Sequence, residues 1–408
     1  MTMTRGGLRS LAMLAGVAMT AMLATNPAAA EDTIKLGFTA AITGPFNEFG
    51  EGIRRGAEIA VEQWNANGGV DGKKVELAEV LDDQLVPDRA VQNMRRILDN
   101  EEIVALIAPS GSGPTLAVVD MVEADGRPMC NTQAQTPKIT YPNGPEGGPR
   151  PNVFSVSIDN TVEAEKLAQA LGSQFKNIGL LHESTGYGVT GAELVANAIK
   201  AANPDVQVTT QSYNQRAQDM TAQLTHVQRA GADVILVIGL GADLAVIRKN
   251  MARLNINLPF YASAGGITPP YMEGAGDLVK GTRAASTKAL GLDPLPPETK
   301  KFLDLYKAKH GVDRWWGSDP DKAQIPIATT VGTAYDCVNL LLTAIKNAKS
   351  TEPEAIIKAM EEIKDFPGAS IQKISFSPEK HRALGVDDLA VYEIDKQGDT
   401  IKLNMVQE

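Results

Sequence analysis

Residues 34–69 read IKLGFTAAITGPFNEFGEGIRRGAEIAVEQWNANGG, and this stretch decides the fold. Its first residues, Ile34 to Phe38, are mostly apolar and predict a buried β-strand. After a polar turn, apolar residues recur every three or four positions from Phe49 to Asn67, which predicts an amphipathic helix. Gly68 and Gly69 end that helix. A strand that leads directly into a helix is the repeating unit of an α/β fold.

The same alternation continues along the chain and then restarts after Pro151. Apolar runs predict strands, and the amphipathic stretches between them predict helices. The first set has strands at 74–80, 103–107 and from 128, with helices at 89–98 and from about 114. The second set has strands at 178–181, 206–210, 234–238 and 258–261, with helices at 190–201, 220–230 and 242–254. Two such sets predict an α/β fold with two Rossmann-like, doubly wound lobes, each with its own parallel sheet.

The last third of the chain is expected to return to both lobes rather than to form a third domain. It contains predicted strands at 282–286, 371–376, 389–394 and 401–405, and predicted helices at 298–310 and 328–347.

The first thirty residues have the pattern of a signal peptide. Arg5 and Arg9 precede an uncharged apolar run, Leu11–Leu23, and the small residues 28–30 (AAA) follow. A membrane anchor is the alternative, but a spanning helix needs ~20 apolar residues and this run is shorter. We therefore expect cleavage near Ala30 and a mature protein in the periplasm.

Charge and cysteine content narrow the class of protein further. The net charge of −10 becomes −12 when the two arginines of the signal segment are removed, and such an acidic surface argues against nucleic acid or anionic lipid as a partner. The 408 − 30 = 378 remaining residues are enough for two domains. Cys130 and Cys337 could form a bridge, but their apolar surroundings favour buried free thiols.

The motifs of enzymes and metal sites are absent from the sequence. The four histidines are scattered, and no HExxH, GxSxG or Walker A pattern occurs. Gly239-Leu240-Gly241 is followed by Leu244 where a dinucleotide-binding loop needs glycine. Asp82-Asp83 could suggest a cation site, but a solvated strand end is the preferred interpretation. We expect no enzymatic activity, no cofactor and no metal.

Binding chemistry is concentrated where predicted strands end. Ser110–Thr115 (SGSGPT) lies between a strand and a helix, where open N–H groups can bind an anion. The same residues could instead cap the helix and form a flexible turn. Their position favours binding, because ligands of open α/β sheets lie beyond the carboxyl ends of the strands. Residues 131–135, 183–187 and 263–266 occupy equivalent strand ends.

Several of these segments together resemble the periplasmic solute-binding proteins of the leucine/isoleucine/valine type, which serve ABC importers. The motifs are GFTAAITGP at 37–45, NANGGV at 65–70, Asp82-Asp83, the turn at 110–115 and HESTGYG at 182–188. The resemblance spans essentially the whole mature chain. It implies a type I periplasmic binding protein fold whose lobes are joined by three hinge crossovers, expected at 157–160, 284–287 and 376–379. Lobe 1 would then contain residues 31–157 and 286–376, and lobe 2 residues 158–285 and 377–408.

The resemblance also implies a ligand site between the lobes. In the amino-acid binders the serine-rich turn holds the ligand carboxylate, a role that falls here to Ser112 and its neighbours. The segment after the fourth strand would supply further polar contacts at Ala134 and Gln135. Phe49 and Tyr187 would form aromatic walls. The implied ligand-binding residues are Phe49, Ser112, Gly113, Ala134, Gln135, Tyr187, Leu240 and Ala264.

Two positions depart from the family pattern. Ala264 stands where the amino-acid binders have a glutamate that pairs with the ligand ammonium, and Leu240 stands in place of a tyrosine. A buried ammonium without an anionic partner costs several kcal/mol. Either Asp243 or Glu183 substitutes, or the ligand has no ammonium, and we favour the second. The family's disulfide is also absent, since no cysteine lies near Val86.

The sequence thus predicts a monomeric solute-binding protein that delivers a small organic carboxylate, with an aromatic or branched-chain-like body, to an ABC permease. One alternative is an amino-acid binder with a different ammonium partner. The other is a ligand-sensing subunit for a receptor or kinase.

Overall fold

The computed structural model describes residues 33–313 and 330–406. The predicted signal peptide, its cleavage site and the first two residues of the helix predicted at 328–347 lie outside this part of the chain. Two sheets organise the described residues, and we call each sheet with its covering helices a lobe.

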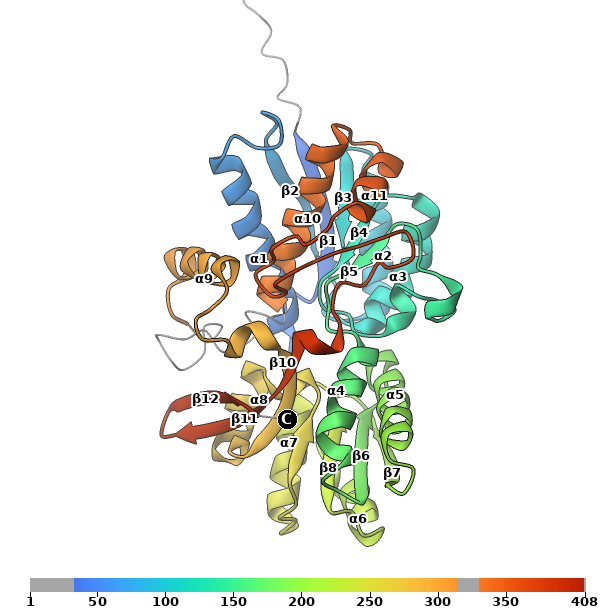
Figure 1. Ribbon diagram of the computed structural model, residues 1–408, viewed down its shortest axis with the longest axis vertical. Coiled ribbons are helices and arrows are strands. Elements are labelled where there is room, and N and C mark those ends of the chain that lie inside the picture. The colour runs from blue at the N-terminus through green and yellow to red at the C-terminus, as the bar shows by residue number, and fades with distance from the viewer. Residues whose placement is uncertain (1–32, 314–329, 407–408) are drawn as a thin grey trace, which may run out of the picture. The chain divides into compact units, whose positions relative to one another are not determined.

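The sheet of lobe 1 has five parallel strands in the order β2-β1-β3-β4-β5. They are β1 (Ile34–Ala40), β2 (Val75–Asp82), β3 (Ile103–Ile107), β4 (Met129–Asn131) and β5 (Val153–Ser155). The connecting helices are α1 (Asn47–Ala66), α2 (Pro87–Leu98) and α3 (Ser112–Asp125). Helices α2 and α3 pack against each other, while α1 packs against α10 (Gly332–Ala348), which comes from much later in the chain (Figure 1).

Glycine permits the close approach of α1 and α10. A β-carbon at Gly56 would lie 2.0 Å from the carbonyl oxygen of Val331, so a larger residue would push the two helices apart. Helix α11 (Pro353–Glu361) packs on α10 in turn.

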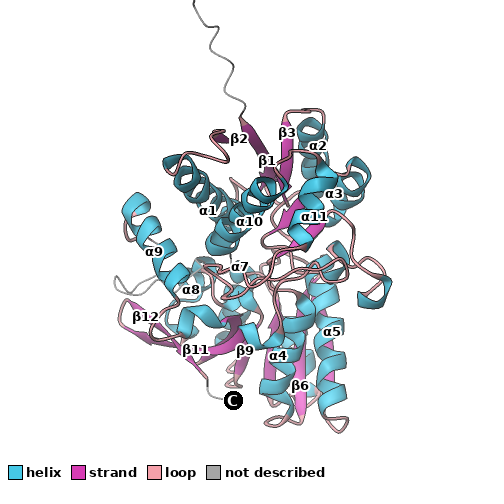
Figure 2. Ribbon diagram, turned by 45° about the horizontal axis from the view of Figure 1, so that its top comes forward, coloured by secondary structure: helices cyan, strands magenta, loops and turns pink. Residues whose placement is uncertain are grey.

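The sheet of lobe 2 has seven strands in the order β12-β11-β10-β9-β8-β6-β7. The parallel strands are β6 (Asn177–Glu183), β7 (Gln207–Tyr213), β8 (Val234–Ile238), β9 (Phe260–Ala262) and β10 (Thr282–Thr287). The antiparallel pair β11 (Leu389–Gln397) and β12 (Thr400–Met405) adds to the edge at β10, so this sheet is mixed rather than purely parallel (Figure 2). Its helices are α4 (Asn160–Gly172), α5 (Gly186–Ala202), α6 (Thr221–Arg229), α7 (Gly241–Arg253) and α8 (Pro269–Ala275).

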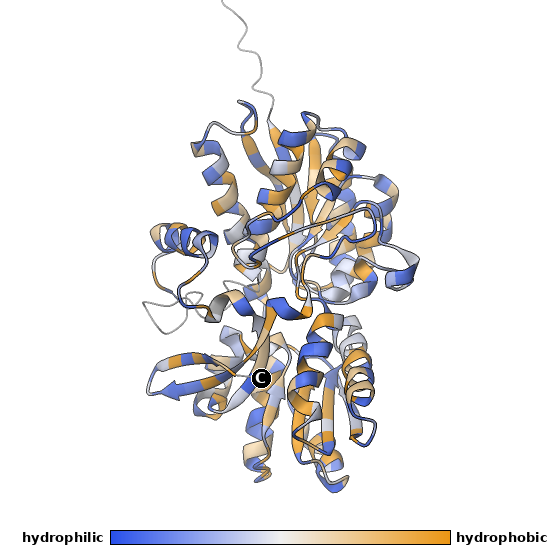
Figure 3. Ribbon diagram, viewed as in Figure 1, coloured by the Kyte–Doolittle hydropathy of each residue, from blue (hydrophilic) through white to orange (hydrophobic). Residues whose placement is uncertain are grey.

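The central strands of both sheets, such as β3 and β8, are hydrophobic because helices cover both faces of the sheet there (Figure 3). All five residues of β8 are buried, for example. The parallel parts of the two sheets share one winding order, since β7-β6-β8-β9-β10 repeats the pattern β2-β1-β3-β4-β5. In such sheets the order reverses beside the first strand, and ligands bind at the carboxyl ends of the strands at that point.

The segments that connect the two sheets do not all lie where the crossovers were expected. The first crossover was expected at 157–160, and the chain passes from β5 into α4, which begins at Asn160. Residues 284–287, expected to be the second crossover, instead form the end of β10 and pair with β11, so the chain leaves that sheet only afterwards. Helix α9 (Pro297–His310) then precedes α10. On the last pass the chain runs beside the first, because Ser155 accepts a hydrogen bond from the N–H of Ala383 and donates one to the carbonyl of His381.

One predicted strand is not present. Residues 371–376 form no strand and make only a single β-bridge, between Ile374 and Phe366. A side chain holds this segment, since the Asp336 carboxylate on α10 accepts hydrogen bonds from the N–H groups of Ala369 (2.6 Å) and Ser370 (2.9 Å). Apolar residues therefore face the core here without joining a sheet.

The expectation of a solvated strand end at Asp82-Asp83 is wrong for Asp83. Its side chain is fully buried and accepts hydrogen bonds from the Thr39 hydroxyl and the Leu85 N–H. Burial raises the pKa of Asp83 to about 6. The residue fastens the turn after β2 rather than facing solvent.

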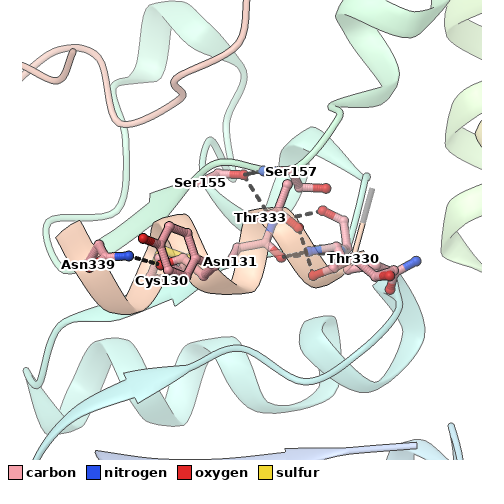
Figure 4. The surroundings of a disulfide bond; sticks show 11 residues. Cys130, Asn131, Ser155, Ser157, Thr330, Thr333 and Asn339 are labelled. Atoms are coloured by element: carbon pink, nitrogen blue, oxygen red, sulfur yellow. Dashed lines mark hydrogen bonds between the residues drawn. A yellow bond between two sulfur atoms is a disulfide. The ribbon is translucent and has the colours of Figure 1, made fainter. Parts of the chain in front are cut away.

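The expectation of two free thiols is also wrong. Cys130 on β4 and Cys337 on α10 form a disulfide, with their Cα atoms 5.8 Å apart (Figure 4). The two cysteines are 207 residues apart, and local sequence gave no sign that α10 returns to the strand that carries Cys130. The disulfide thus ties the returning helix to the sheet of lobe 1.

Candidate functional site

A cavity of about 170 Å³ lies among the loops that follow the carboxyl ends of strands in both lobes. Its walls combine apolar, aromatic and amide side chains with one serine hydroxyl and one carboxylate. The lining residues are Phe49, Leu85, Pro87, Gly111, Ser112, Gly113, Pro114, Gln133, Gln135, Glu183, Thr185, Tyr187, Gln215, Leu240, Ala264, Gly265, Thr268 and Thr330.

The structure brings most of the predicted ligand-binding residues to this cavity. Phe49, Ser112, Gly113, Gln135, Tyr187, Leu240 and Ala264 line it. Ala134 does not, because its backbone is turned toward Asn131, whose side chain bonds both the N–H and the carbonyl of Ala134.

The Ser112 side chain has a single group left to offer a ligand. Its hydroxyl oxygen accepts hydrogen bonds from the N–H groups of Gln135 and Thr136, both at 3.1 Å. A serine hydroxyl has two acceptor positions and one donor proton, so only the proton remains. The Ser112 side chain is therefore set up as a donor toward an acceptor in the cavity.

The start of helix α3 adds backbone donors at the same place. Ser112 and Gly113 are its first two residues, and N–H groups at this position have no carbonyl partner within the helix. The serines do not cap the helix, since Gly111 occupies the cap position without a side-chain hydrogen bond, and the Ser110 hydroxyl accepts the N–H of Ala41. The capping alternative for this turn is therefore wrong, and its geometry suits an anion.

Two aromatic side chains line the cavity, one from each lobe. Phe49 comes from α1 and Tyr187 from α5, and both are buried. Burial raises the pKa of the Tyr187 phenol well above its usual value, so its hydroxyl stays protonated.

Glu183 is the acid that lines the cavity, but its oxygens are already engaged. Oε2 accepts the N–H of Thr185, while Oε1 accepts the Thr185 hydroxyl and the N–H of Gly188. A β-carbon at Gly188 would lie 2.2 Å from the Glu183 carbonyl oxygen, so only glycine fits beside it. Glu183 thus fastens the start of α5, where a negative charge is favourable.

Asp243, the other acid considered as an ammonium partner, does not line the cavity. Its Oδ1 accepts the N–H of Arg216 at 3.1 Å. Burial raises the pKa of Asp243 to about 7.

Sequence reasoning missed Glu163 on α4. Its carboxylate is fully buried and accepts the N–H of Ala264 at 2.7 Å, so an acid lies directly behind the cavity wall at that position. Burial raises the pKa of Glu163 to about 7. Helix α4 was itself not predicted, and no local pattern connects Glu163 with Ala264, which lies 101 residues later.

The glutamine side chains that line the cavity differ in their hydrogen bonding within the protein. Gln133 accepts the N–H of Gly111 at 2.7 Å, whereas the buried Oε1 of Gln135 has no hydrogen-bond partner among the described residues. Of these glutamines, sequence reasoning identified only Gln135, because Gln133 and Gln215 lie on turns whose path it did not resolve.

The described part of the chain contains no cluster of three or more histidine, cysteine, aspartate or glutamate side chains able to hold a metal ion. None of its helices is long and apolar enough to cross a bilayer.

Comparison with known proteins gives a consistent result. A family model described as "Periplasmic binding protein" matches residues 33–399. The leucine-, isoleucine-, valine-, threonine-, and alanine-binding protein of Pseudomonas aeruginosa is 25% identical over 360 residues, which cover 88% of this chain and 89% of that protein. The Leu/Ile/Val-binding protein homolog 3 of Brucella melitensis is 26% identical over 368 residues, covering 88% and 91% of the two chains.

Solved structures resemble the chain over the same range. A periplasmic binding protein type 1 from Bordetella pertussis is 52% identical with a TM-score of 0.88, covering 92% of this chain and all of that one. A leucine-binding protein from Thermotoga maritima has a TM-score of 0.77 at 23% identity, covering 91% and 98% of the two chains, which supports the fold alone.

Proposed function

Because the chain belongs to the periplasmic binding protein family, and within it to the branched-chain amino-acid type, we propose that its solute is a small organic carboxylate without an ammonium group. Proteins of this family bind solutes for ABC importers and are not enzymes, so a membrane permease is the partner that receives the solute. Membership also implies export to the periplasm. We further propose cleavage near Ala30, a monomeric state and the lobe boundaries given above.

The geometry of Ser112 is the observation that carries the proposal. Its free proton and the first N–H groups of α3 are donors that converge on one side of the cavity, where a carboxylate can accept them. Hydrogen bonds to a charged group contribute roughly 1.5–3 kcal/mol each. The positive end of the helix dipole favours the same charge.

The opposite side of the cavity supports a ligand without an amine. Ala264 contributes only a methyl group to the cavity wall. Behind it, Glu163 Oε1 already accepts a hydrogen bond from the Ala264 N–H. Glu183 has its oxygens engaged in the start of α5. An ammonium would have to compete with these existing hydrogen bonds for a counter-charge.

The remaining walls suit an apolar or aromatic body. Phe49 and Tyr187 would clamp it from the two lobes, and Leu240 and Pro114 would add apolar contact. Contacts made only in the closed form would shift an existing open–closed equilibrium, which is how a ligand that touches both lobes drives closure.

An amino acid is the second candidate. It is favoured by the ligands in the names of the relatives and by the presence of Glu183 in the cavity wall. In that case Glu183 would have to pair with the ammonium while it keeps the start of α5 in place.

A thermal-shift screen of the mature protein separates the two candidates. Leucine and valine are compared with their deaminated 2-oxo acids and with benzoate and phenylacetate. A ligand at a hundred times its Kd stabilises the folded state by about 2.7 kcal/mol, which is easily detected. The proposal expects the acids without an amine to raise the melting temperature, and it is wrong if leucine or valine does so while those acids do not.

A further inference from the structure

An arginine of lobe 2 lies over an aromatic ring of lobe 1, next to the cavity but outside its lining. The Arg216 guanidinium carbon is 4.8 Å from the centre of the Phe46 ring. A guanidinium within about 6 Å of a ring centre is attracted by the negative face of the ring. Phe46 precedes α1 in lobe 1, and Arg216 follows β7 in lobe 2, so the contact joins the lobes.

Phe46 is buried in a hydrophobic cluster made mainly of lobe 2 residues. Only 1% of its surface is exposed, and it belongs to a buried cluster with lobe 2 residues that include Leu240 and Ile238. Its ring stacks on Phe49 with the ring centres 6.4 Å apart and the planes 18° apart. Since Phe49 lines the cavity, Phe46 connects the ligand wall to the contact with Arg216.

The backbone and an acid hold Arg216 in place. Its φ angle of 68° is unusual for a residue with a side chain, and its N–H donates to Asp243 Oδ1 at 3.1 Å. The other oxygen, Asp243 Oδ2, is buried and has no hydrogen-bond partner among the described residues. The positive charge of the nearby Arg216 favours the ionised form of Asp243.

We propose that Arg216, held by Asp243 and lying over Phe46, is a latch that stabilises the closed form and sets ligand affinity without touching the ligand. This inference rests on one part of the proposed function, the binding of a solute between the lobes, and it does not depend on which solute binds. A latch of this kind changes the open–closed equilibrium, and therefore weakens every ligand by the same factor when it is lost.

The chain contains a matched control for the test. The Arg248 guanidinium carbon lies 4.9 Å from the centre of the Phe260 ring, and both residues belong to lobe 2. Arg216→Gln removes a cation–π contact between the lobes. Arg248→Gln removes a similar contact within one lobe, together with hydrogen bonds that Arg248 donates to the Leu278 carbonyl. Because Arg216 is exposed, loss of the latch should weaken binding by about 2- to 5-fold, the range that cation–π contacts cover at exposed sites.

The affinities are measured by calorimetry for leucine, 4-methyl-2-oxopentanoate and benzoate. We expect Arg216→Gln to weaken each probe that the wild type binds by one common factor, and Arg248→Gln to lower the melting temperature without changing affinity. Phe46→Leu keeps the apolar packing and loses the ring face, so it should weaken binding similarly. The double variant Arg216→Gln/Phe46→Leu should be no weaker than the weaker single variant, because the two changes remove one interaction.

Unchanged affinity in Arg216→Gln overturns the latch, and so does a weakening that differs between probes, since that would mean direct contact with the ligand. A preference of the wild type for leucine would overturn the proposal that the ligand lacks an ammonium group. It would not overturn the latch, which is tested by the ratio of variant to wild-type affinity for a single probe. If the wild type binds none of the three probes, small-angle X-ray scattering of the unliganded proteins decides. A larger radius of gyration for Arg216→Gln than for wild type and Arg248→Gln supports the latch, and an equal radius overturns it.

Discussion

At Ser112 one hydroxyl does two things in the cavity wall. It accepts the N–H groups of Gln135 and Thr136, which fixes the loop after β4, and it keeps its proton for a ligand. The first of these is structural and the second is specific to binding. A substitution at Ser112 must therefore be compared with the loss of a purely structural serine.

Ser112→Ala should weaken a carboxylate ligand by about 10- to 100-fold, the equivalent of one hydrogen bond to a charged group. Isothermal titration calorimetry measures the change with the acid that binds best in the screen. Ser110→Ala is the control, because the Ser110 hydroxyl also accepts a buried N–H, that of Ala41, but does not line the cavity. Equal affinity losses in the two variants would contradict a direct role for Ser112.

Glu163 predicts a dependence of stability on pH. Burial raises its pKa to about 7 in the folded protein, whereas an unfolded chain releases this proton near the ordinary value of 4.5. Between these values the folded state holds a proton that the unfolded state has lost, so a rise in pH through this window destabilises the folded state. Glu163→Gln keeps an acceptor for the Ala264 N–H and removes the titration.

Urea unfolding at several pH values between about 5 and 8 measures the difference. The free energy of unfolding of the wild type should fall relative to that of Glu163→Gln by up to a few kcal/mol as the pH rises. Glu165→Gln, an exposed position on the same helix, should leave the pH profile of the wild type unchanged. Parallel profiles for wild type and Glu163→Gln would show that this proton is not linked to folding.

Among the elements, helix α10 has the most distant attachments along the chain. It packs on α1, is joined to β4 by the Cys130–Cys337 disulfide, and holds residues 369–370 through Asp336. These contacts place a late segment in lobe 1, between neighbours from the first third of the chain. The attachment of α10 is thus a tertiary feature, with a covalent part that can be removed.

Replacing both cysteines by alanine should lower the free energy of unfolding by about 2–5 kcal/mol, because the unfolded chain then gains the freedom of an open loop. Calorimetric melting with and without a reductant measures this. The reductant should lower the melting temperature of the wild type toward that of the double variant and leave the double variant unchanged. If the wild-type protein is unfolded without reductant and both cysteines then react with an alkylating agent, the disulfide is not present.

At the scale of the whole molecule, the ligand site depends on both lobes together. The cavity wall takes Ser112 and Phe49 from lobe 1 and Tyr187 and Leu240 from lobe 2. Neither lobe alone encloses the cavity, and no chemical step is needed for its use. Binding should therefore stabilise the molecule reversibly and leave the ligand unaltered.

The acid that binds best should raise the melting temperature further as its concentration rises, by about 1.4 kcal/mol of stability for each tenfold increase above its Kd. Calorimetry follows the stability, and mass spectrometry examines the ligand after the protein is denatured. The ligand should be recovered with its original mass, and dialysis should restore the original melting temperature. A product of different mass would contradict a pure binding function.

The sequence by itself determined the local elements, because their signals lie within a few residues of each other. The bounds of β3 and β8 agree with the predicted strands, since each is a short apolar run between polar turns. The serine-rich turn was recognisable in the same way, and family motifs extended this to seven of the residues that line the cavity. Strand β5, at three residues, is too short to show any periodicity.

The tertiary structure alone decided which distant residues meet. The disulfide, the carboxylate of Glu163 behind Ala264 and the guanidinium of Arg216 over Phe46 each join segments far apart in the chain. Such contacts are set by how helices and sheets pack, and local periodicity carries no information about them. The strand predicted at 371–376 is absent for the same reason, because Asp336 on the distant helix α10 holds the backbone at residues 369–370, just before it.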